Sequence, residues 1–389
     1  MRGAHGALKA GYFGYFAAVG VFQPYWSLQL AGQGFAPAAI GTLLAAVSVA
    51  RVVAPLVQAR IAGQVGDDGR ALAVAATLAA LLLPFIAATR DFRLALVLMA
   101  LYALAFNGFM PVYDALALKL LGADQHRYGR LRLWGSIGYV AASAVVGELI
   151  GRGGRAVIPW ALGSCLVGTA IVCRGLSGVA ANARPEPGPA APRRAEAVWF
   201  VLVCFLQLAS FGAYYGFYGL YLETYGYSAA AIGRLFALGV LAEMVFFYAA
   251  APLLARVSAY RLLALAIGAT TLRWLLIAGF PRSVLVLALA QVMHIFGFAL
   301  FHSVTVLLGP RLLRMGPERS QALVSSAGWG AGVGAGTLLA GRVWQAGGPR
   351  LMYGAAAGVA ALALAVALTM LRNDQLSRSP AAAATEAQA

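Results

Sequence analysis

The sequence predicts an all-α membrane protein with twelve transmembrane helices in two pseudo-symmetric six-helix bundles. Hydrophobic residues make up 61% of its 389 residues and charged residues only 11%, whereas a soluble domain carries about 25% charged residues. The apolar runs are long and unbroken, which excludes an outer-membrane barrel, because barrel strands alternate apolar and polar residues. The same hydrophobicity excludes a disordered chain. A helix needs about 20 apolar residues to cross a bilayer core about 30 Å thick, and twelve such helices fit the apolar content.

Charged residues, prolines and glycines divide the chain into twelve apolar segments, each long enough for one helix. The first is expected to remain as a helix rather than to be removed as a signal peptide, because it is long and contains Gln23 and Pro24. The expected helices span about residues 10–31, 38–59, 71–89, 94–116, 133–151, 156–173, 197–222, 230–254, 262–280, 283–307, 321–341 and 351–371.

The distribution of positive charge predicts the orientation of the chain. Lys and Arg concentrate in alternate connections, and positively charged loops stay in the cytoplasm. Both termini are therefore expected on the cytoplasmic side of the cytoplasmic (inner) membrane. The net charge of +16 is spread over short Arg clusters, with no basic block long enough to bind a nucleic-acid duplex, so we expect no nucleic-acid partner. The three cysteines lie in apolar runs and are expected to be free thiols: Cys165, Cys173 and Cys204.

The two halves of the chain resemble each other. Ile40–Arg51 aligns with Ile232–Glu243, and the first and seventh segments share that offset without a gap. A parallel repeat of this kind is typical of transporters, although coincidence in Ala- and Leu-rich sequence is the alternative. The expected division is an N-terminal bundle over 1–173, a cytoplasmic linker containing RPEPGPAAPRR over 174–196, a C-terminal bundle over 197–371 and a cytoplasmic tail over 372–389.

Two charged residues lie at equivalent positions of this repeat, near the middle of the bilayer. They are Arg51 in the second segment and Glu243 in the eighth. An unpaired charge at the bilayer centre costs about 2.5 to 3.5 kcal/mol on insertion scales, so each needs a partner. We expect them to form an interfacial ion pair that breaks or shifts during transport; a static pair that fixes helix register is the alternative. Arg273 in the ninth segment is a further candidate, for holding an anionic group.

The tenth segment, QVMHIFGFALFHSV, places Gln291, His294, Phe298 and His302 on one helical face. Histidine titrates near physiological pH, so a pair lining water can carry a proton or bind a solute by hydrogen bonds. The alternative is that both histidines are packing residues. No third ligand at a suitable spacing accompanies them, so neither a metal nor any other cofactor is expected.

Aromatic and amide side chains form stripes along the first and seventh segments. Such faces offer stacking area and a few directed hydrogen bonds, which suits a small organic solute. Asn107 lies at mid-depth in the fourth segment. The expected substrate-binding residues are Tyr15, Gln23, Asn107, Gln207, Tyr214, Tyr218, Gln291 and His294.

Several segments spread over most of the chain carry a resemblance to a known family. They are PYWSLQLAGQGFAPAAIG with Arg51, PVYDALALKLLG, RYGRLRLWGSIG, ALGVLAE, LRW and the two histidines of the tenth segment. Together they resemble the major facilitator superfamily, specifically the branch that contains the phenylpropionic acid permeases and is related to the lactose permease group. The resemblance implies two bundles, a central cavity lined by the first, fourth, seventh and tenth helices, and alternating access that is commonly driven by protons.

One motif departs from the pattern of the superfamily. The loop after the second segment usually has Gly, three residues, Asp, Arg and a further Gly-Arg; here it is one residue short and has Asp where Arg is usual. The resemblance implies a cytoplasmic gate in which Asp67 and Arg70 contact Asp114. Either Arg127 or Arg130 could replace the missing Arg, and a solvated turn is the alternative.

These observations predict a secondary active transporter that moves a small organic solute, either an aromatic or other organic acid or a sugar-like molecule. We expect proton-coupled symport by a monomer. A proton-driven efflux pump of the same fold is the closest alternative. A membrane enzyme is disfavoured because the sequence has no HExxH, no phosphate-binding glycine loop and no Ser-His-acid set in its loops.

Overall fold

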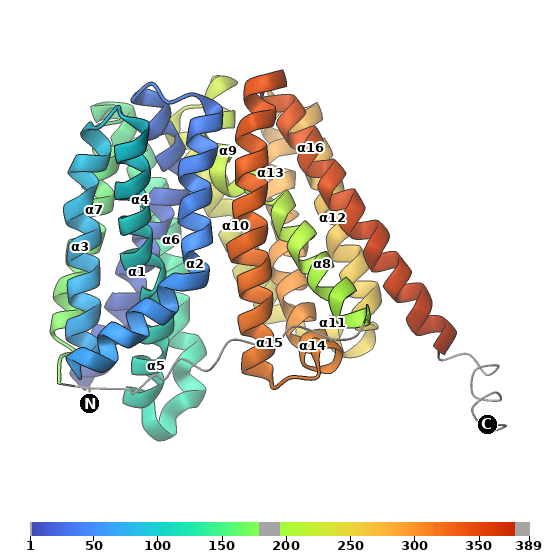
Figure 1. The fold of residues 1–389 in the computed structure, drawn as a ribbon, viewed down its shortest axis with the longest axis horizontal. Helices are drawn as coiled ribbons and strands as arrows, with labels where there is room; N and C mark the ends of the chain where they lie inside the picture. The colour runs from blue at the N-terminus through green and yellow to red at the C-terminus, as the bar shows by residue number, and fades with distance from the viewer. Residues whose placement is uncertain (1, 179–194, 378–389) are drawn as a thin grey trace.

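The computed structural model describes residues 2–178 and 195–377, and within those ranges the chain forms helices and short connections (Figure 1). The α-helices are α1 (Arg2–Gly32), α2 (Pro37–Val65), α3 (Asp68–Ala88), α4 (Phe92–Asn107), α5 (Phe109–Leu121), α6 (Tyr128–Gly153), α7 (Val157–Arg174), α8 (Ala195–Ser210), α9 (Gly212–Thr224), α10 (Ala229–Ala249), α11 (Ala251–Arg256), α12 (Ala259–Gly279), α13 (Val284–Val292), α14 (Phe301–Leu313), α15 (Pro317–Val324) and α16 (Val333–Ser377). One 3₁₀ turn (Gly122–Arg127) and two π-helical turns (Ile295–Leu300 and Ser325–Gly332) complete the set.

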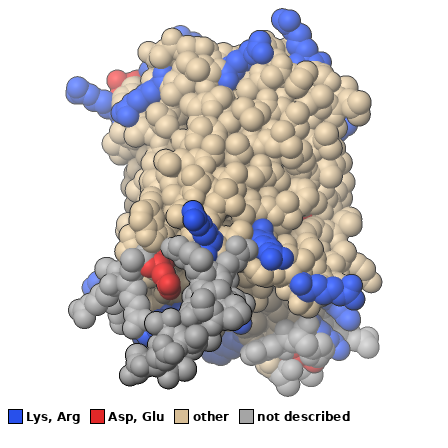
Figure 2. Space-filling model, turned by 90° about the vertical axis from the view of Figure 1, so that its right-hand side faces the viewer, with Lys and Arg blue, Asp and Glu red and all other residues tan. Residues whose placement is uncertain are grey.

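Among the described residues, ten helices are long and apolar enough to cross a membrane. Two segments explain why this number is smaller than the twelve expected transmembrane helices. Helix α1 has 31 residues, enough to span, but it is rich in tyrosine, glycine and glutamine, which lowers its hydropathy. The 56-residue stretch Pro317–Arg372 counts once, although the chain turns at Gly348, where φ is 84°. Figure 2 shows Lys and Arg gathered toward the two ends of one face, with an uncharged surface between them.

Five expected helices are interrupted within their length; the eighth divides at Ala250 into α10 and α11. The fourth divides at Gly108 into α4 and α5, and the seventh divides at Phe211 into α8 and α9. The tenth and eleventh each contain one of the π-helical turns. Such turns are rare and often occur at functional sites, because they free backbone groups and turn side chains out of the regular register. The interruptions at Phe211 and at Ile295–Leu300 adjoin the candidate site described below.

The helices pack in two groups, which we call the N bundle (α1–α7) and the C bundle (α8–α16). Helix α1 packs on α6 and α7 in the first, and α16 packs on α8 and α12 in the second. Between the groups, α2 contacts α16, α6 contacts α10 and α1 contacts α9, so the bundles lie side by side (Figure 1). The expected linker and tail fall mostly on residues 179–194 and 378–389, which lie outside the described residues.

The bundles meet at the end of the molecule that holds the α1–α2, α6–α7 and α9–α10 connections, which we call the far end. The Tyr25 hydroxyl of α1 donates to the carbonyl oxygens of Ser143 (2.5 Å) and Ala229 (3.2 Å), which belong to different bundles. Two glycines there allow backbones to touch: a Cβ at Gly219 would overlap the Pro24 carbonyl oxygen, and one at Gly233 would overlap that of Ser143. At the opposite end, which we call the terminal end, α5 and α14 pack on helices of their own bundles. The structure therefore holds the far end closed.

An ion pair also joins the bundles at the far end, and we expect it to contribute little. The Arg155 Nη2 lies 2.9 Å from Glu223 Oε2, with side chains 40% and 32% exposed. Exposed pairs are worth about 0 to 1 kcal/mol, because water and salt screen them. Arg155→Gln should therefore lower the free energy of unfolding by no more than about 1 kcal/mol. Thermal unfolding in detergent measures this, with the exposed neighbour Arg152→Gln as the control; a much larger loss would contradict the prediction.

Candidate functional site

Three ionisable side chains of the C bundle form a buried chain. His294 Nε2 lies 2.8 Å from Glu243 Oε1, and Arg273 Nη1 lies 2.8 Å from His294 Nδ1. Glu243 projects from α10, Arg273 from α12 and His294 from the junction of α13 with the π-helical turn Ile295–Leu300. Their exposed fractions are 9%, 0% and 4%. Intramembrane ionisable residues are costly and mark ion or solute pathways by default, so this chain is the centre of the candidate site.

Hydrogen-bond chemistry fixes where the protons of this chain lie. Arg273 can only donate and stays charged, so His294 Nδ1 must accept. The remaining ring proton is then on Nε2, which donates to Glu243. His294 is therefore neutral while Arg273 is bound to it, and Glu243 balances the charge of Arg273. A further proton entering this arrangement has Glu243 as its acceptor.

Arg273 is held on several sides by groups of the C bundle. Its Nε donates to the Ala290 carbonyl oxygen at 2.6 Å. Its guanidinium carbon lies 4.4 Å from the ring centre of Tyr214 and 4.6 Å from that of Trp274. The Tyr214 hydroxyl donates to Gln291 Oε1 at 3.0 Å. Cation–π and hydrogen-bond contacts of this kind fix a buried guanidinium in one place, which makes it a rigid support for His294.

Other expected substrate-binding residues of the C bundle surround this chain. Gln207 Nε2 donates to Thr270 Oγ1 at 2.9 Å, and the Tyr218 ring lies 5.1 Å from that of Tyr214. Within the described part of the chain, Gln207 Oε1, Gln291 Nε2 and the Tyr218 hydroxyl are buried without a hydrogen-bond partner. Buried polar groups are normally satisfied, so this part of the C bundle retains capacity for further hydrogen bonds.

The expected substrate-binding residues of the N bundle lie on α1 and at the end of α4. The Tyr15 ring stacks on Phe106, with ring centres 4.8 Å apart. Gln23 Oε1 accepts from the Tyr139 hydroxyl at 3.1 Å. Asn107 Nδ2 donates to the Val47 carbonyl oxygen at 2.7 Å. Asn107 thus ties the interruption between α4 and α5 to α2.

The expected direct pair between Arg51 and Glu243 is not present in this structure. Glu243 bonds to His294 instead, because the neighbouring helices α12 and α13 of its own bundle bring a closer partner. Arg51 is exposed and forms no ion pair with another described residue. His302 is exposed on α14, eight residues beyond His294. The two histidines therefore do not form one cluster.

The structure arranges the expected gate residues differently from the gate that the resemblance implies. Asp67 is the N-cap of α3, and its carboxylate accepts from the Arg70 backbone N–H at 3.0 Å and from that of Gly178 at 2.8 Å. Asp114 does not contact them. Its Oδ2 lies 3.1 Å from Arg132 Nη1.

Helix geometry accounts for the partner of Asp114. Arg132 and Tyr128 are one turn apart on α6 and share a face, and Arg132 Nη1 donates to the Tyr128 hydroxyl. The Tyr12 hydroxyl donates to Asp114 Oδ1 at 2.6 Å. Arg127 pairs with Asp124 at 3.5 Å, and Arg130 is exposed on another face of α6. Sequence reasoning did not assign Arg132, although the spacing of tyrosine and arginine in RYGRLRLW could have placed the two on one face.

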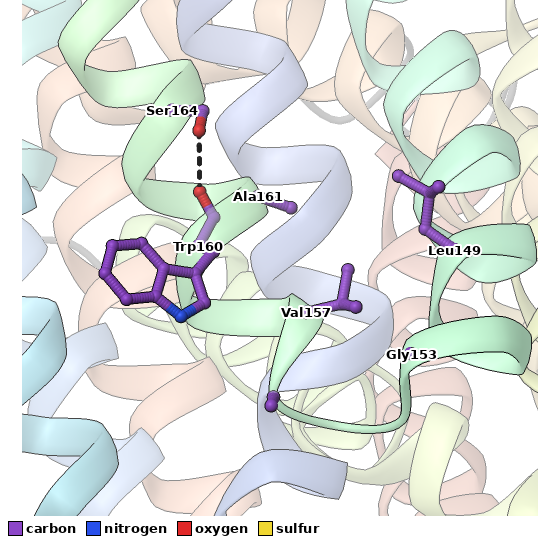
Figure 3. A pocket seen from close by; sticks show the side chains of 7 residues that line it. Leu149, Gly153, Val157, Trp160, Ala161 and Ser164 are labelled. Atoms are coloured by element: carbon purple, nitrogen blue, oxygen red, sulfur yellow. Dashed lines mark hydrogen bonds between the residues drawn. The ribbon is translucent and has the colours of Figure 1, made fainter.

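A shallow apolar pocket lies apart from these groups, on the outer side of the N bundle between α6 and α7. Trp160 is 73% exposed there, and Ser164 donates to the Trp160 carbonyl oxygen at 2.9 Å (Figure 3). Its lining is Leu149, Gly153, Ala156, Val157, Trp160, Ala161 and Ser164. Apolar walls without a directed polar group suit lipid chains, so we assign this pocket no part in the candidate site.

Fold and site together define a multi-pass helical membrane transporter. The chain belongs to the MFS_1 like family, whose model matches residues 5–355, which confirms the resemblance to the major facilitator superfamily. A probable 3-phenylpropionic acid transporter of Escherichia coli (strain K12) is 33% identical over 360 residues, covering 87% of this chain and 90% of that protein. A maltose permease of Geobacillus stearothermophilus is 29% identical over 360 residues, covering 88% and 89%. These relatives are transporters and not enzymes.

Solved structures show the same fold. The crystal structure of the nucleoside transporter NupG has a TM-score of 0.82 at 16% identity, covering 95% of this chain and 99% of that one. The crystal structure of a bacterial homologue of the iron transporter ferroportin has a TM-score of 0.70 at 14% identity, covering 95% and 98%. At these identities the likeness concerns the fold alone.

Proposed function

We propose that the protein is a proton-coupled symporter of small aromatic carboxylates in the cytoplasmic membrane. The observation that carries this proposal is the buried chain Glu243–His294–Arg273. The relative named as a probable 3-phenylpropionic acid transporter supports an aromatic acid as solute. The relative named as a maltose permease keeps a sugar as the alternative that the experiment below must separate. The working unit is one chain with its solute and protons, and no nucleic acid takes part.

Charge balance links the proton to an anion. The three linked side chains are neutral overall while Glu243 is ionised, because Arg273 carries one positive charge and His294 none. A proton on Glu243 leaves one uncompensated positive charge in a buried place, which is costly. A carboxylate bound near this chain lowers that cost through its opposite charge, so proton and anion each favour the binding of the other. The transported pair then carries no net charge.

Alternating access follows from the two bundles. The closed far end faces the outside in this proposal, because the Lys and Arg distribution places the termini in the cytoplasm. Opening it requires the loss of the contacts between α1 and α9 and between α6 and α10. The solute site then opens to the other side of the membrane.

The proposal predicts transport that responds to a pH gradient and not to membrane potential. Purified protein in proteoliposomes should take up radiolabelled 3-phenylpropionate when the outside is acidic, and a gradient of one unit is worth about 1.4 kcal/mol, or about tenfold accumulation. A potassium diffusion potential set with valinomycin should leave the initial rate unchanged. Saturable initial rates are measured, and protein-free vesicles supply the passive flux of the neutral acid.

Two results would contradict the proposal. Uptake driven by potential alone would show that net charge moves. Saturable uptake of maltose or a nucleoside, with no saturable uptake of any aromatic acid, would assign the protein to a neutral solute.

A further inference from the structure

Arg51 lies on the side of α2 that faces the C bundle. It follows Leu44 by seven residues, so the two share one face of the helix. A Cβ placed at Gly216 of α9 would lie 3.7 Å from a Leu44 methyl group, which places that face against the C bundle. The opposite face carries Val53, which is 48% exposed and apolar as a lipid-facing residue is. Arg51 is therefore exposed between the bundles and not toward lipid.

Arg51 lies at the border with the C bundle and has no acidic partner among the described residues. Its neighbour Val52 lies against Gly330, which adjoins Trp329 of the C bundle. In the described part of the chain Arg51 has neither a hydrogen bond nor an ion pair. The acid at the equivalent repeat position, Glu243, already bonds to His294. A charged residue at this depth requires a partner, and the protein supplies none here.

Partly buried rings of the C bundle form a continuous wall near this position. The Tyr215 and Trp329 ring centres are 5.5 Å apart, and those of Trp329 and Phe298 are 5.6 Å apart. Phe298 in turn stacks on His294, with ring centres 5.6 Å apart. The wall thus connects the surroundings of Arg51 to the buried chain of ionisable residues. Aromatic rings prefer edge-to-face or offset contacts with other rings, so the wall suits an aromatic solute.

We propose that Arg51 binds the carboxylate of an aromatic carboxylic acid whose ring lies against Tyr215 and Trp329. The inference rests on the proposed function and adds the residue that recognises the charge. An arginine presents two parallel N–H groups that match a carboxylate, which gives both strength and orientation. Arg51 belongs to the N bundle and the rings to the C bundle, so the solute would contact both bundles at once.

The test compares a charged ligand with its neutral isostere on matched variants. Isothermal titration measures binding of 3-phenylpropionate and 3-phenylpropionamide to the purified wild type, Arg51→Gln, Arg51→Lys and Arg60→Gln. Arg60 lies on the same helix nine residues on, hence on roughly the opposite face, and is the control. Arg51→Gln should weaken acid binding about tenfold or more while the amide changes less than about twofold. Arg51→Lys should weaken the acid by about threefold, and Arg60→Gln should change neither ligand.

The inference is overturned if Arg51→Gln, or Arg51→Lys where the glutamine variant does not fold, keeps the wild-type ratio of acid to amide affinity. It is also overturned if the exchange Arg51→Glu with Glu243→Arg restores transport, since that would show a pairing role. A wild type that binds neither aromatic ligand but binds maltose would contradict the proposed function itself. If the wild type binds the acid and Arg51→Gln binds it with unchanged affinity, only the proposed role of Arg51 is contradicted.

Discussion

Glu243→Gln should abolish accumulation driven by a pH gradient and leave exchange of solute across the membrane intact. Glutamine keeps an oxygen that accepts from His294 Nε2 but cannot take up a proton. The variant therefore resembles the protonated state permanently, with the charge of Arg273 left uncompensated inside the C bundle. We expect its accumulation ratio to fall to one, while counterflow of labelled acid against unlabelled acid persists.

Binding measurements sharpen this prediction. In the wild type, a rising pH removes the proton from Glu243 and so should weaken binding of the anionic solute, by linkage. In Glu243→Gln that dependence should vanish, and affinity at high pH should equal affinity at low pH. Glu148→Gln is the matched control, because Glu148 is an exposed acid of α6 with only a weak contact to Arg234. Retention of gradient-driven accumulation by Glu243→Gln would show that another group carries the proton.

Gly219→Val and Gly233→Val should each prevent full closure of the far end. A Cβ at either position overlaps a backbone carbonyl oxygen of the opposite bundle, which cannot rotate away as a side chain could. Overpacking of this kind costs about 1 to 3 kcal/mol, and that shifts an equilibrium between two states about 5- to 150-fold. We expect transport to fall by a similar factor and the far-end-open state to gain population.

Distances between spin labels at Arg152 and Arg282, which are exposed residues of the two bundles, report this change. The labels should move apart in both glycine variants. Gly358→Val is the control, because a Cβ at Gly358 meets no atom within 4 Å. Unchanged distances together with normal transport would show that the far end does not separate at these contacts.

Apolar content and charge distribution predict most of the fold, because the bilayer permits few structures other than helices. Glu243, Arg273 and His294 are each identifiable from sequence as charges or histidines within apolar segments. Their assembly into one chain is not, since it depends on how three helices of one bundle rotate about their axes. The repeat relates Arg51 to Glu243 by position, but equivalent positions of two bundles need not touch. In this structure Glu243 accordingly pairs with His294 and not with Arg51.

The interruptions of the helices escape prediction for a different reason. Asn107, Gly108 and Pro111 do mark the first interruption, but nothing in the composition of Ile295–Leu300 separates it from ordinary apolar helix. Their position is set by partners distant in sequence, such as the bond from Asn107 to the Val47 carbonyl oxygen. The pairing of Asp114 with Arg132 likewise depends on how α5 meets α6 beyond the 3₁₀ turn.

The glycine contacts at the far end have a kinetic consequence. Gly219 and Gly233 themselves have no side chain that could stretch or reorient to bridge a partial gap. Dispersion attraction falls steeply within an ångström of separation, so intermediate degrees of parting retain little of it. The two bundles therefore separate at the far end in one abrupt step, as expected for packed interfaces with two discrete arrangements. Its rate should depend on temperature and on lateral pressure in the bilayer, and hardly at all on ionic strength.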